Sequence, residues 1–227
     1  MIRRRATSCE VLLSVSLAMM LLGAAALPDS PAQAMDEEMS ESVIVAFGDS
    51  LTAGLGLPEK DAFPAQLEQA LRARGQKVRV VNAGVSGDTT AAALARLDWS
   101  IPDDADAVIV EFGGNDALLG LDPAATKATL EKIITGIKAR GLPVLLAGME
   151  APRNMGRDYV EAFSALYPDL ARGYDLVFYP FFLAGVALDP EMMQPDGIHP
   201  NEQGVARIVE GILPKVEELL ARVEAKG

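Results

Sequence analysis

Five short apolar runs alternate along the chain with longer segments of helical periodicity, and this alternation limits the possible folds more than any other feature. The apolar runs are 43–47, 78–81, 107–112, 144–148 and 176–179. The segments with helical periodicity are 62–75, 89–97, 124–141, 158–173 and 201–227. Strands that alternate with helices pair in parallel, and the connecting helices cover both faces of the sheet. The sequence therefore predicts an α/β domain.

Three glycines stand at the expected carboxyl ends of helices. Gly75, Gly141 and Gly173 each come directly after an arginine, at the end of a segment with helical periodicity. A glycine just past the last helical residue adopts a left-handed conformation with little strain. We therefore expect these three glycines to terminate their helices.

The amino-terminal segment resembles a secretory signal peptide. Arg3, Arg4 and Arg5 precede an apolar stretch (11–27), and Ala32-Gln33-Ala34 has the small residues of a cleavage site. We expect a signal peptide over 1–34, a linker over 35–42 and one domain over 43–227, in a periplasmic or secreted protein. The alternative is an uncleaved membrane anchor, although a stretch of about 17 apolar residues is short for a transmembrane helix.

The residue composition excludes several kinds of site. Cys9 is the only cysteine and lies in the expected signal peptide, so disulfides, thiolate nucleophiles and cysteine zinc sites are excluded from the cleaved chain. His199 is the only histidine, which excludes a metal site with several histidines. The net charge of −12 disfavours nucleic acid and anionic membranes as partners. We expect no cofactor and no metal.

Ser50 is the first candidate for chemistry. It follows the first apolar run in "VIVAFGDSLTAG" (43–54), at the end of a parallel strand, where open α/β sheets form their ligand crevice. A serine in this place is also an ordinary helix N-cap. Asp196 and His199, in "DGIHP" (196–200), supply the base that a serine nucleophile needs and a carboxylate that orients it.

Two further loops offer donors for the oxyanion of an acyl-transfer intermediate. "NAGVSGDT" (82–89) follows the second apolar run and contains Gly87, whose backbone N–H is accessible without a side chain. "EFGGND" (111–116) follows the third run and contains Asn115 with its side-chain amide. Either residue, taken singly, is also typical of a turn.

The four motifs, in their order along the chain, resemble those of the SGNH hydrolases, the GDSL family of esterases and lipases. Within that family the chain is similar to bacterial periplasmic thioesterases and lysophospholipases. The resemblance implies a three-layer α/β/α flavodoxin-like fold with a five-stranded parallel sheet, and a monomer that uses no cofactor. It also implies that Ser50 is the nucleophile, that Asp196 and His199 complete the triad, and that Ser50, Gly87 and Asn115 form the oxyanion hole. The substrate would be a small-molecule ester or thioester.

Other acidic residues near these motifs are expected to stabilise loops. Asp49 adjoins Ser50, whereas the orienting carboxylate of a triad must lie behind the histidine. We therefore expect Asp49 to accept hydrogen bonds from N–H groups around the serine turn. Asp88 and Asp116 are expected to hold their own loops.

Three leucines after Asn115 suggest a wall for an acyl chain. Leu118, Leu119 and Leu121 lie in "NDALLGLDP" (115–123), although leucines in such a loop can equally pack on the core. Ala151 stands where relatives often have leucine, so the preferred chain length stays open.

Two alternative functions also remain: a carbohydrate acetylesterase with the same machinery, and a non-catalytic protein that binds acyl ligands.

Overall fold

The computed structural model describes residues 41–225. The expected signal peptide (1–34) and residues 35–40 of the expected linker lie outside the described residues. Within 41–225, no helix combines the length and the apolar composition that crossing a membrane requires.

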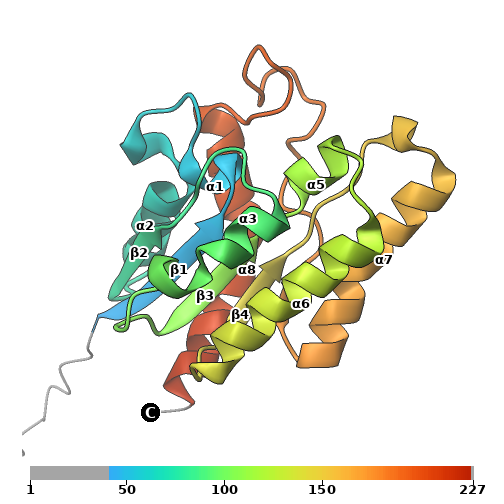
Figure 1. Cartoon of the computed structure of the whole chain (residues 1–227). Helices are drawn as coiled ribbons and strands as arrows, with labels where there is room; N and C mark the ends of the chain where they lie inside the picture. Colours follow the sequence, from blue (N-terminus) through green and yellow to red (C-terminus); the bar gives the residue numbers. More distant parts are fainter. Residues whose placement is uncertain (1–40, 226–227) are drawn as a thin grey trace, which may run out of the picture. The chain divides into compact units, whose positions relative to one another are not determined.

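The five expected strands form one parallel sheet. They are β1 (Ser42–Gly48), β2 (Val78–Asn82), β3 (Ala107–Glu111), β4 (Val144–Ala147) and β5 (Val177–Tyr179). Their order in the sheet is β2-β1-β3-β4-β5, and every neighbouring pair is parallel. This is the strand order of flavodoxin-like folds, so the predicted fold class is confirmed (Figure 1).

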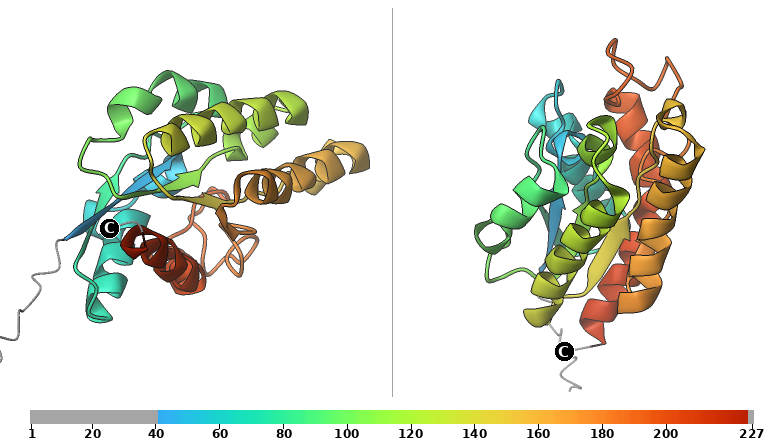
Figure 2. Two further views of the ribbon diagram at one scale, coloured as in Figure 1. Left: turned by 90° about the horizontal axis from the view of Figure 1, so that it is seen from below. Right: turned by 45° about the vertical axis from the view of Figure 1, so that its right-hand side comes forward.

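Helices cover both faces of the sheet. Helices α2 (Phe63–Ala73) and α8 (Glu202–Glu224) pack together on one face, while α3 (Thr90–Ala95), α6 (Pro123–Ala139) and α7 (Arg157–Tyr174) pack on the other (Figure 2). The remaining helices are short: α1 (Ser50–Ala53), α4 (Leu97–Ser100), α5 (Gly114–Leu118), and the 3₁₀ turns η1 (Glu59–Asp61) and η2 (Arg153–Met155). The layers are therefore helix, sheet and helix, as predicted.

The core lies on both sides of the central strands. All residues of β3 and β4 are buried, and so are those of β1 after Ser42. Phe47 from β1 and Phe112 after β3 make an edge-to-face contact with their ring centroids 4.8 Å apart. Strands that are buried on both faces need continuous apolar sequence, which explains why the runs at these positions lack alternating polar residues.

The structure corrects the prediction for one glycine. Gly75 and Gly141 follow their helices with φ of 84° and 79°, as expected. Gly173 lies inside α7 instead, and Asp175 ends this helix in the left-handed conformation with φ of 50°. Aspartate tolerates that conformation better than most residues, so the helix continues past the glycine that we expected to stop it.

The topology places a crevice beside β1. The chain leaves β1 for β2 on one side and later returns to β3 on the other side, so β1 and β3 are neighbours at a topological switch point. Ligands of open α/β sheets bind outside the carboxyl ends of strands at such a point. Helices α1 and α5 and the loop between β5 and α8 all lie at this end (Figure 1).

Candidate active site

Ser50 occupies the first position of α1, directly after the carboxyl end of β1. Asp49 is the N-cap of this short helix, and its Oδ1 accepts a hydrogen bond from the N–H of Leu51 at 3.0 Å. The expected role of Asp49 in the serine turn is thereby confirmed. The backbone N–H of Ser50 donates to no acceptor among residues 41–225. It is therefore free to donate to an incoming ligand.

The loop 180–201 between β5 and α8 brings the histidine to the serine. Nε2 of His199 lies 2.9 Å from Oγ of Ser50, although the two residues are separated by 149 positions. Nδ1 of His199 lies 2.7 Å from Oδ2 of Asp196. The three side chains thus form a continuous hydrogen-bonded chain that ends at the serine hydroxyl.

Asp196 is held in its ionised form. Its carboxylate accepts the hydrogen bond of the His199 ring and those of the backbone N–H groups of His199 and Ile198. These bonds favour the charged state and lower the pKa of Asp196 to about 2. The carboxylate is therefore available to hold the proton of His199 on Nδ1, which leaves Nε2 as an acceptor.

Gln194 ties the histidine loop to the serine loop, a role that the sequence interpretation missed. Its side-chain amide donates to the carbonyls of Leu55, at 2.8 Å, and Pro200, at 3.0 Å. Its backbone N–H donates to the carbonyl of His199 at 2.7 Å. The residue precedes "PDGIHP", but its long-range partner Leu55 has no signal in the local sequence.

Asn115 lies in the second position of α5, after Gly113. Nδ2 of Asn115 donates to Oδ2 of Asp49 at 3.0 Å and to the carbonyl of Asp88 at 2.9 Å. Gly113 has a φ of 114°, and a Cβ at this position would lie 2.1 Å from the hydroxyl of Tyr167. Only glycine therefore fits this turn, which aims the amide toward the serine turn.

Gly87 lies in the exposed turn between β2 and α3, with a φ of 86°. Its N–H has no acceptor within the described part of the chain. The residue is absent from the lining of the cavity at Ser50 that the described residues form. Its link to the site is the next residue, because the carbonyl of Asp88 accepts from Asn115.

Asp88 and Asp116 stabilise loops, as predicted. Asp88 forms an ion pair with Arg96 at 2.6 Å. The carboxylate of Asp116 accepts from both the N–H, at 2.9 Å, and the hydroxyl, at 2.6 Å, of Thr90. These contacts fasten the loops after β2 and β3 to α3, and thereby support the segment that carries Gly87.

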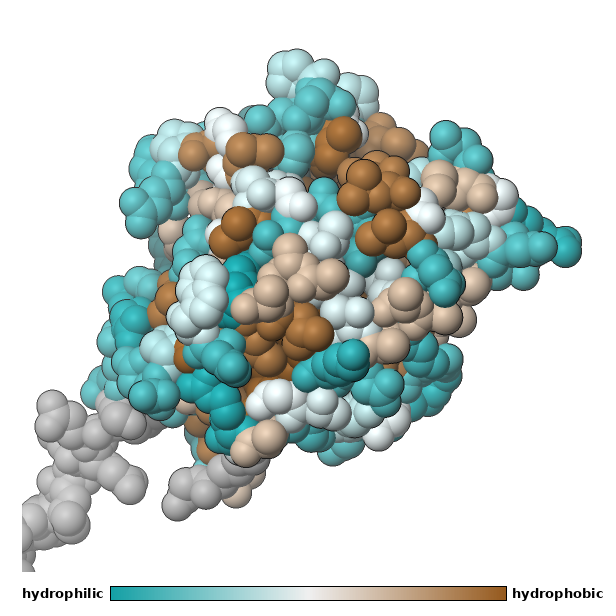
Figure 3. Space-filling view, in the orientation of Figure 1, coloured by the Kyte–Doolittle hydropathy of each residue, from teal (hydrophilic) through white to brown (hydrophobic). Residues whose placement is uncertain are grey.

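A cavity of about 360 Å³ opens over Ser50 and His199. Its wall is mainly apolar and comes from α5 and from the loops after β4 and β5: Leu118, Met149, Pro152, Leu183, Ala187, Leu188, Met193 and Ile198. Apolar side chains also reach the surface near the upper edge of Figure 3, above the carboxyl ends of the strands. The shape and lining suit an apolar group attached to a reacting centre.

Only one of the three leucines expected to form an acyl wall lines this cavity. All three leucines are exposed, but Leu118 contributes to the wall, whereas Leu119 and Leu121 lie outside the lining formed by residues 41–225. Ala151 is buried in the core and does not line the cavity within the described chain. Most of the wall therefore comes from loops to which the sequence interpretation assigned no binding role.

Leu188 is the most unusual of these wall residues. It adopts a left-handed conformation with φ of 69°, and 85% of its surface is exposed. A leucine rarely adopts this backbone conformation, because its side chain crowds the following carbonyl. The loop therefore holds an apolar side chain out at the rim of the cavity, where a substrate can cover it.

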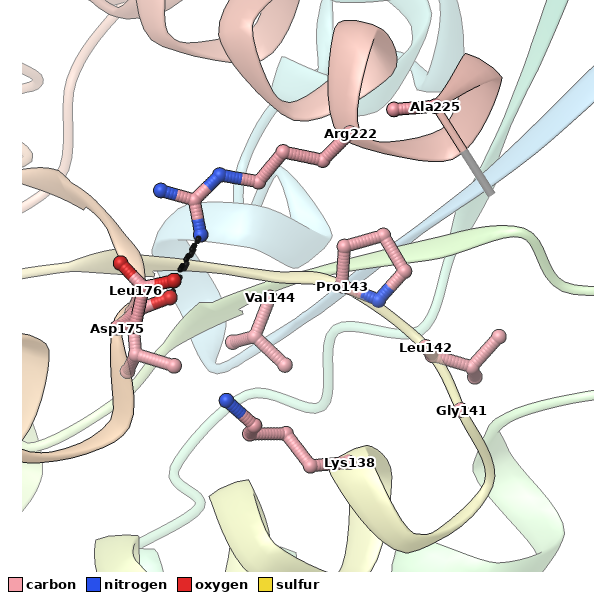
Figure 4. A pocket seen from close by; sticks show the side chains of 9 residues that line it. All are labelled: Lys138, Gly141, Leu142, Pro143, Val144, Asp175, Leu176, Arg222 and Ala225. Atoms are coloured by element: carbon pink, nitrogen blue, oxygen red, sulfur yellow. Dashed lines mark hydrogen bonds and ion pairs between the residues drawn. The ribbon is translucent and has the colours of Figure 1, made fainter. Parts of the chain in front are cut away.

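A second hollow, of about 380 Å³, lies at the other end of the sheet. Lys138, Asp175 and Arg222 project into it, and their charges already have partners (Figure 4). Lys138 donates to the carbonyl of Tyr174, and Arg222 donates to the carbonyl of Asp175 and pairs with its carboxylate at 3.6 Å. This hollow offers no acid, base or nucleophile comparable to those beside Ser50.

Residues 46–207 match the model of the GDSL-like lipase/acylhydrolase family. The chain belongs to this family. The match extends from β1 to α8 and includes the hydrogen-bonded chain of Ser50, His199 and Asp196. The protein is therefore an enzyme of the GDSL esterase type, as the four sequence motifs indicated.

Named relatives within the family are esterases and thioesterases. Esterase TesA of Pseudomonas aeruginosa is 38% identical over 187 residues, which cover 82% of this chain and 93% of that protein. Thioesterase 1/protease 1/lysophospholipase L1 of Escherichia coli K12 is 40% identical over 178 residues, covering 78% of this chain and 84% of the relative.

Solved structures show the same similarity. A crystal structure of TesA has a TM-score of 0.75 and 39% identity, and the alignment covers 78% of this chain and 99% of the other. The SGNH-hydrolase family esterase AlinE4 has a TM-score of 0.68 and 46% identity, covering 80% of this chain and 97% of the other. Both support the assignment of the α/β fold to the SGNH hydrolases.

Proposed function

We propose that the protein hydrolyses carboxylic esters and thioesters through an acyl-serine intermediate. The observation that carries this proposal is the chain of hydrogen bonds from Ser50 Oγ through His199 to Asp196, at the floor of an apolar cavity. A serine hydroxyl is a weak nucleophile until a base accepts its proton, and this arrangement supplies such a base. The names of the relatives, esterase and thioesterase, support the same class of substrate.

The reaction proceeds in two halves. Ser50 Oγ attacks the carbonyl carbon while its proton passes to Nε2 of His199, and Asp196 stabilises the imidazolium. The imidazolium then protonates the departing alkoxide or thiolate, which leaves an ester between the acyl group and Ser50. Water attacks this ester with His199 again as base, and the carboxylic acid leaves.

The oxyanion of each tetrahedral intermediate needs hydrogen-bond donors. The N–H groups of Ser50 and Gly87 are free of acceptors within the described chain, and Nδ2 of Asn115 is the third donor that we assign. Both hydrogens of that amide are engaged by Asp49 and Asp88. In the reaction, one of these bonds must lengthen or be shared with the oxyanion.

A series of p-nitrophenyl esters from acetate to palmitate tests this function. We expect hydrolysis of several members of the series, because the proposed machinery acts on the ester carbonyl, which all of them share. A folded protein that releases no p-nitrophenol from any of them would favour the alternative of an acyl-ligand binder. A strong preference for acetate would favour a carbohydrate acetylesterase.

We predict that esters of roughly six to twelve carbons react faster than acetate, since each buried methylene contributes up to about 0.8 kcal/mol, or about fourfold in rate. Leu118 lines the cavity and Leu119 does not, within residues 41–225. Leu118→Ser is therefore expected to reduce the ratio of kcat/KM for octanoate over acetate by about tenfold. Leu119→Ser, a matched control on the neighbouring residue, is expected to keep the ratio. An equal loss in both variants would contradict the assignment of Leu118 to the acyl wall.

The amino terminus of the mature protein is a separate prediction. The arginines at 3–5, the apolar stretch and Ala32-Gln33-Ala34 support export and cleavage after Ala34. Mass spectrometry of the protein purified from its native host is expected to give a chain that starts at Met35. Recovery of the full-length chain in the membrane fraction would show that the segment is an anchor instead.

A further inference from the structure

Glu111 is a buried carboxyl group that the proposed reaction does not use. It is the last residue of β3, and none of its surface is exposed. Its Oε2 lies 2.8 Å from the hydroxyl of Thr52. Its Oε1 has no hydrogen-bond partner among the residues that the structure describes. A buried carboxylate oxygen without a partner is costly, and its presence calls for a physical reason.

Glu111 is tightly packed and has no positively charged partner among the described residues. Gly48 is its neighbour in the register of β1 and β3, and a Cβ there would lie 2.7 Å from Oε2 of Glu111 and 2.0 Å from the hydroxyl of Thr52. No lysine, arginine or histidine of the described chain forms an ion pair with Glu111. Arg96, the nearby buried cation, pairs with Asp88 and donates to the carbonyl of Gly48.

Asp49 is a second buried carboxyl group next to Glu111. The N–H of Asp49 points at Oε2 of Glu111 from 3.4 Å. The two oxygens of Asp49 accept different hydrogen bonds, one from the N–H of Leu51 and the other from Nδ2 of Asn115. Asp49 therefore connects the buried glutamate to the amide that we assign to the oxyanion hole.

Burial and neighbouring charges raise the pKa of both carboxyl groups. Burial raises the pKa of Asp49 to about 6, opposed by the N–H of Leu51 and by His199 and reinforced by the charges of Asp88 and Asp116. Burial and the neighbouring charge of Asp49 raise the pKa of Glu111 well above its ordinary range. The other titratable group that faces this region is Tyr167, whose pKa burial also raises.

We propose that Glu111 stays protonated in the working enzyme, which leaves Asp49 as the only charged member of this buried pair and lets its carboxylate orient the amide of Asn115. The hydroxyl of Thr52 donates to Oε2 of Glu111. Oε1, which has no partner among the described residues, is less costly to leave unpaired on a neutral carboxyl group than on a carboxylate. This inference rests on the proposed role of Asn115.

Replacement of each carboxyl group by its amide distinguishes their roles. Glutamine reproduces a neutral Glu111, so Glu111→Gln is expected to keep kcat/KM for p-nitrophenyl butyrate within about threefold. Asparagine has one oxygen in place of the two acceptors of Asp49. Asp49→Asn is therefore expected to lower kcat by on the order of 10² with little change in KM, because the Asn115 amide loses its alignment.

The pH profile of kcat/KM distinguishes a neutral Glu111 from a charged one. We expect the rate to fall at low pH as Asp49 gains a proton and loses its charge. If Glu111 is neutral, Glu111→Gln removes no charge, and the acid limb of kcat/KM stays in place. If Glu111 carries a charge, the variant removes a negative neighbour of Asp49 and moves the acid limb down by about one pH unit. Such a shift would overturn the proposal.

The protonation of Glu111 can also be measured without activity and without changing that residue. Protein that carries Ser50→Ala and glutamate labelled with ¹³C at the δ-carboxyl is titrated by NMR from pH 5 to pH 8, with Glu111 assigned through its own backbone. The carboxyl resonance is expected to keep the position of a protonated acid throughout. A resonance that titrates below pH 7 would contradict the proposal, whether or not Ser50 is the nucleophile.

Discussion

Ser50→Ala is expected to lower kcat for p-nitrophenyl butyrate by on the order of 10⁴ or more, because no acyl-enzyme can form without the hydroxyl. The alanine loses one hydrogen bond, the contact between Oγ and Nε2 of His199 at 2.9 Å. The residue occupies the first position of α1, and alanine is compatible with a helix. The fold is therefore expected to survive, which thermal unfolding followed by circular dichroism checks.

A fluorophosphonate probe links this loss to the serine itself. The probe is expected to add one covalent group to the unaltered protein, on the peptide that contains Ser50, and none to the variant. Ser164→Ala, on the exposed surface of α7, is a matched control with unchanged turnover and labelling. Turnover near that of the unaltered protein in a folded Ser50→Ala variant would refute the acyl-serine mechanism.

Asp196→Asn is expected to lower kcat by on the order of 10³. The asparagine oxygen can still accept from the N–H groups of Ile198 and His199, so the loop keeps its shape. The amide, however, donates to Nδ1 of His199, where the carboxylate had accepted. The ring proton then moves to Nε2, which can no longer accept the proton of Ser50.

Asp189→Asn is the matched control for this substitution. Asp189 lies in the same loop, and its carboxylate accepts from the N–H of Glu191 at 2.9 Å. An asparagine can keep that bond, so activity is expected to stay unchanged. Stopped-flow and steady-state rates on a short ester measure both variants. A kcat for Asp196→Asn within a few-fold of the original would show that the orienting carboxylate is dispensable.

The order of the elements and the hydrogen-bonded arrangement of Ser50, His199 and Asp196 could be predicted from the sequence, because both depend on local patterns. The runs at 43–47 and 107–110 are continuous and apolar, as strands buried on both faces require, and β1 and β3 begin and end within one residue of these positions. The strand-end motifs had to meet at one edge of a parallel sheet, so Ser50 and His199 come within hydrogen-bond distance.

Features that depend on tertiary contacts could not be predicted in this way. Glu111 follows four apolar residues and has the local pattern of an exposed charge at a strand end, but Thr52 and Gly48 bury it from a distant part of the chain. The direction of each leucine after Asn115 depends on where the short helix α5 begins and ends. Leu118 and Leu119 are adjacent in the sequence, yet Leu118 lies in the cavity wall and Leu119 lies outside it.

The distance along the chain between Ser50 and His199 has a consequence for how the enzyme acquires its activity. Consecutive strands are joined through crossovers and not through hairpins, and α8 is held against α2 by Gln66 with Glu202 and by Arg74 with Glu217. The hydrogen bond between the two residues therefore joins parts of the chain that are 149 positions apart. Contacts between residues far apart in the chain slow folding, because the intervening loop must close before they form. We therefore expect the recovery of ester hydrolysis after dilution from denaturant to report the completion of the whole domain.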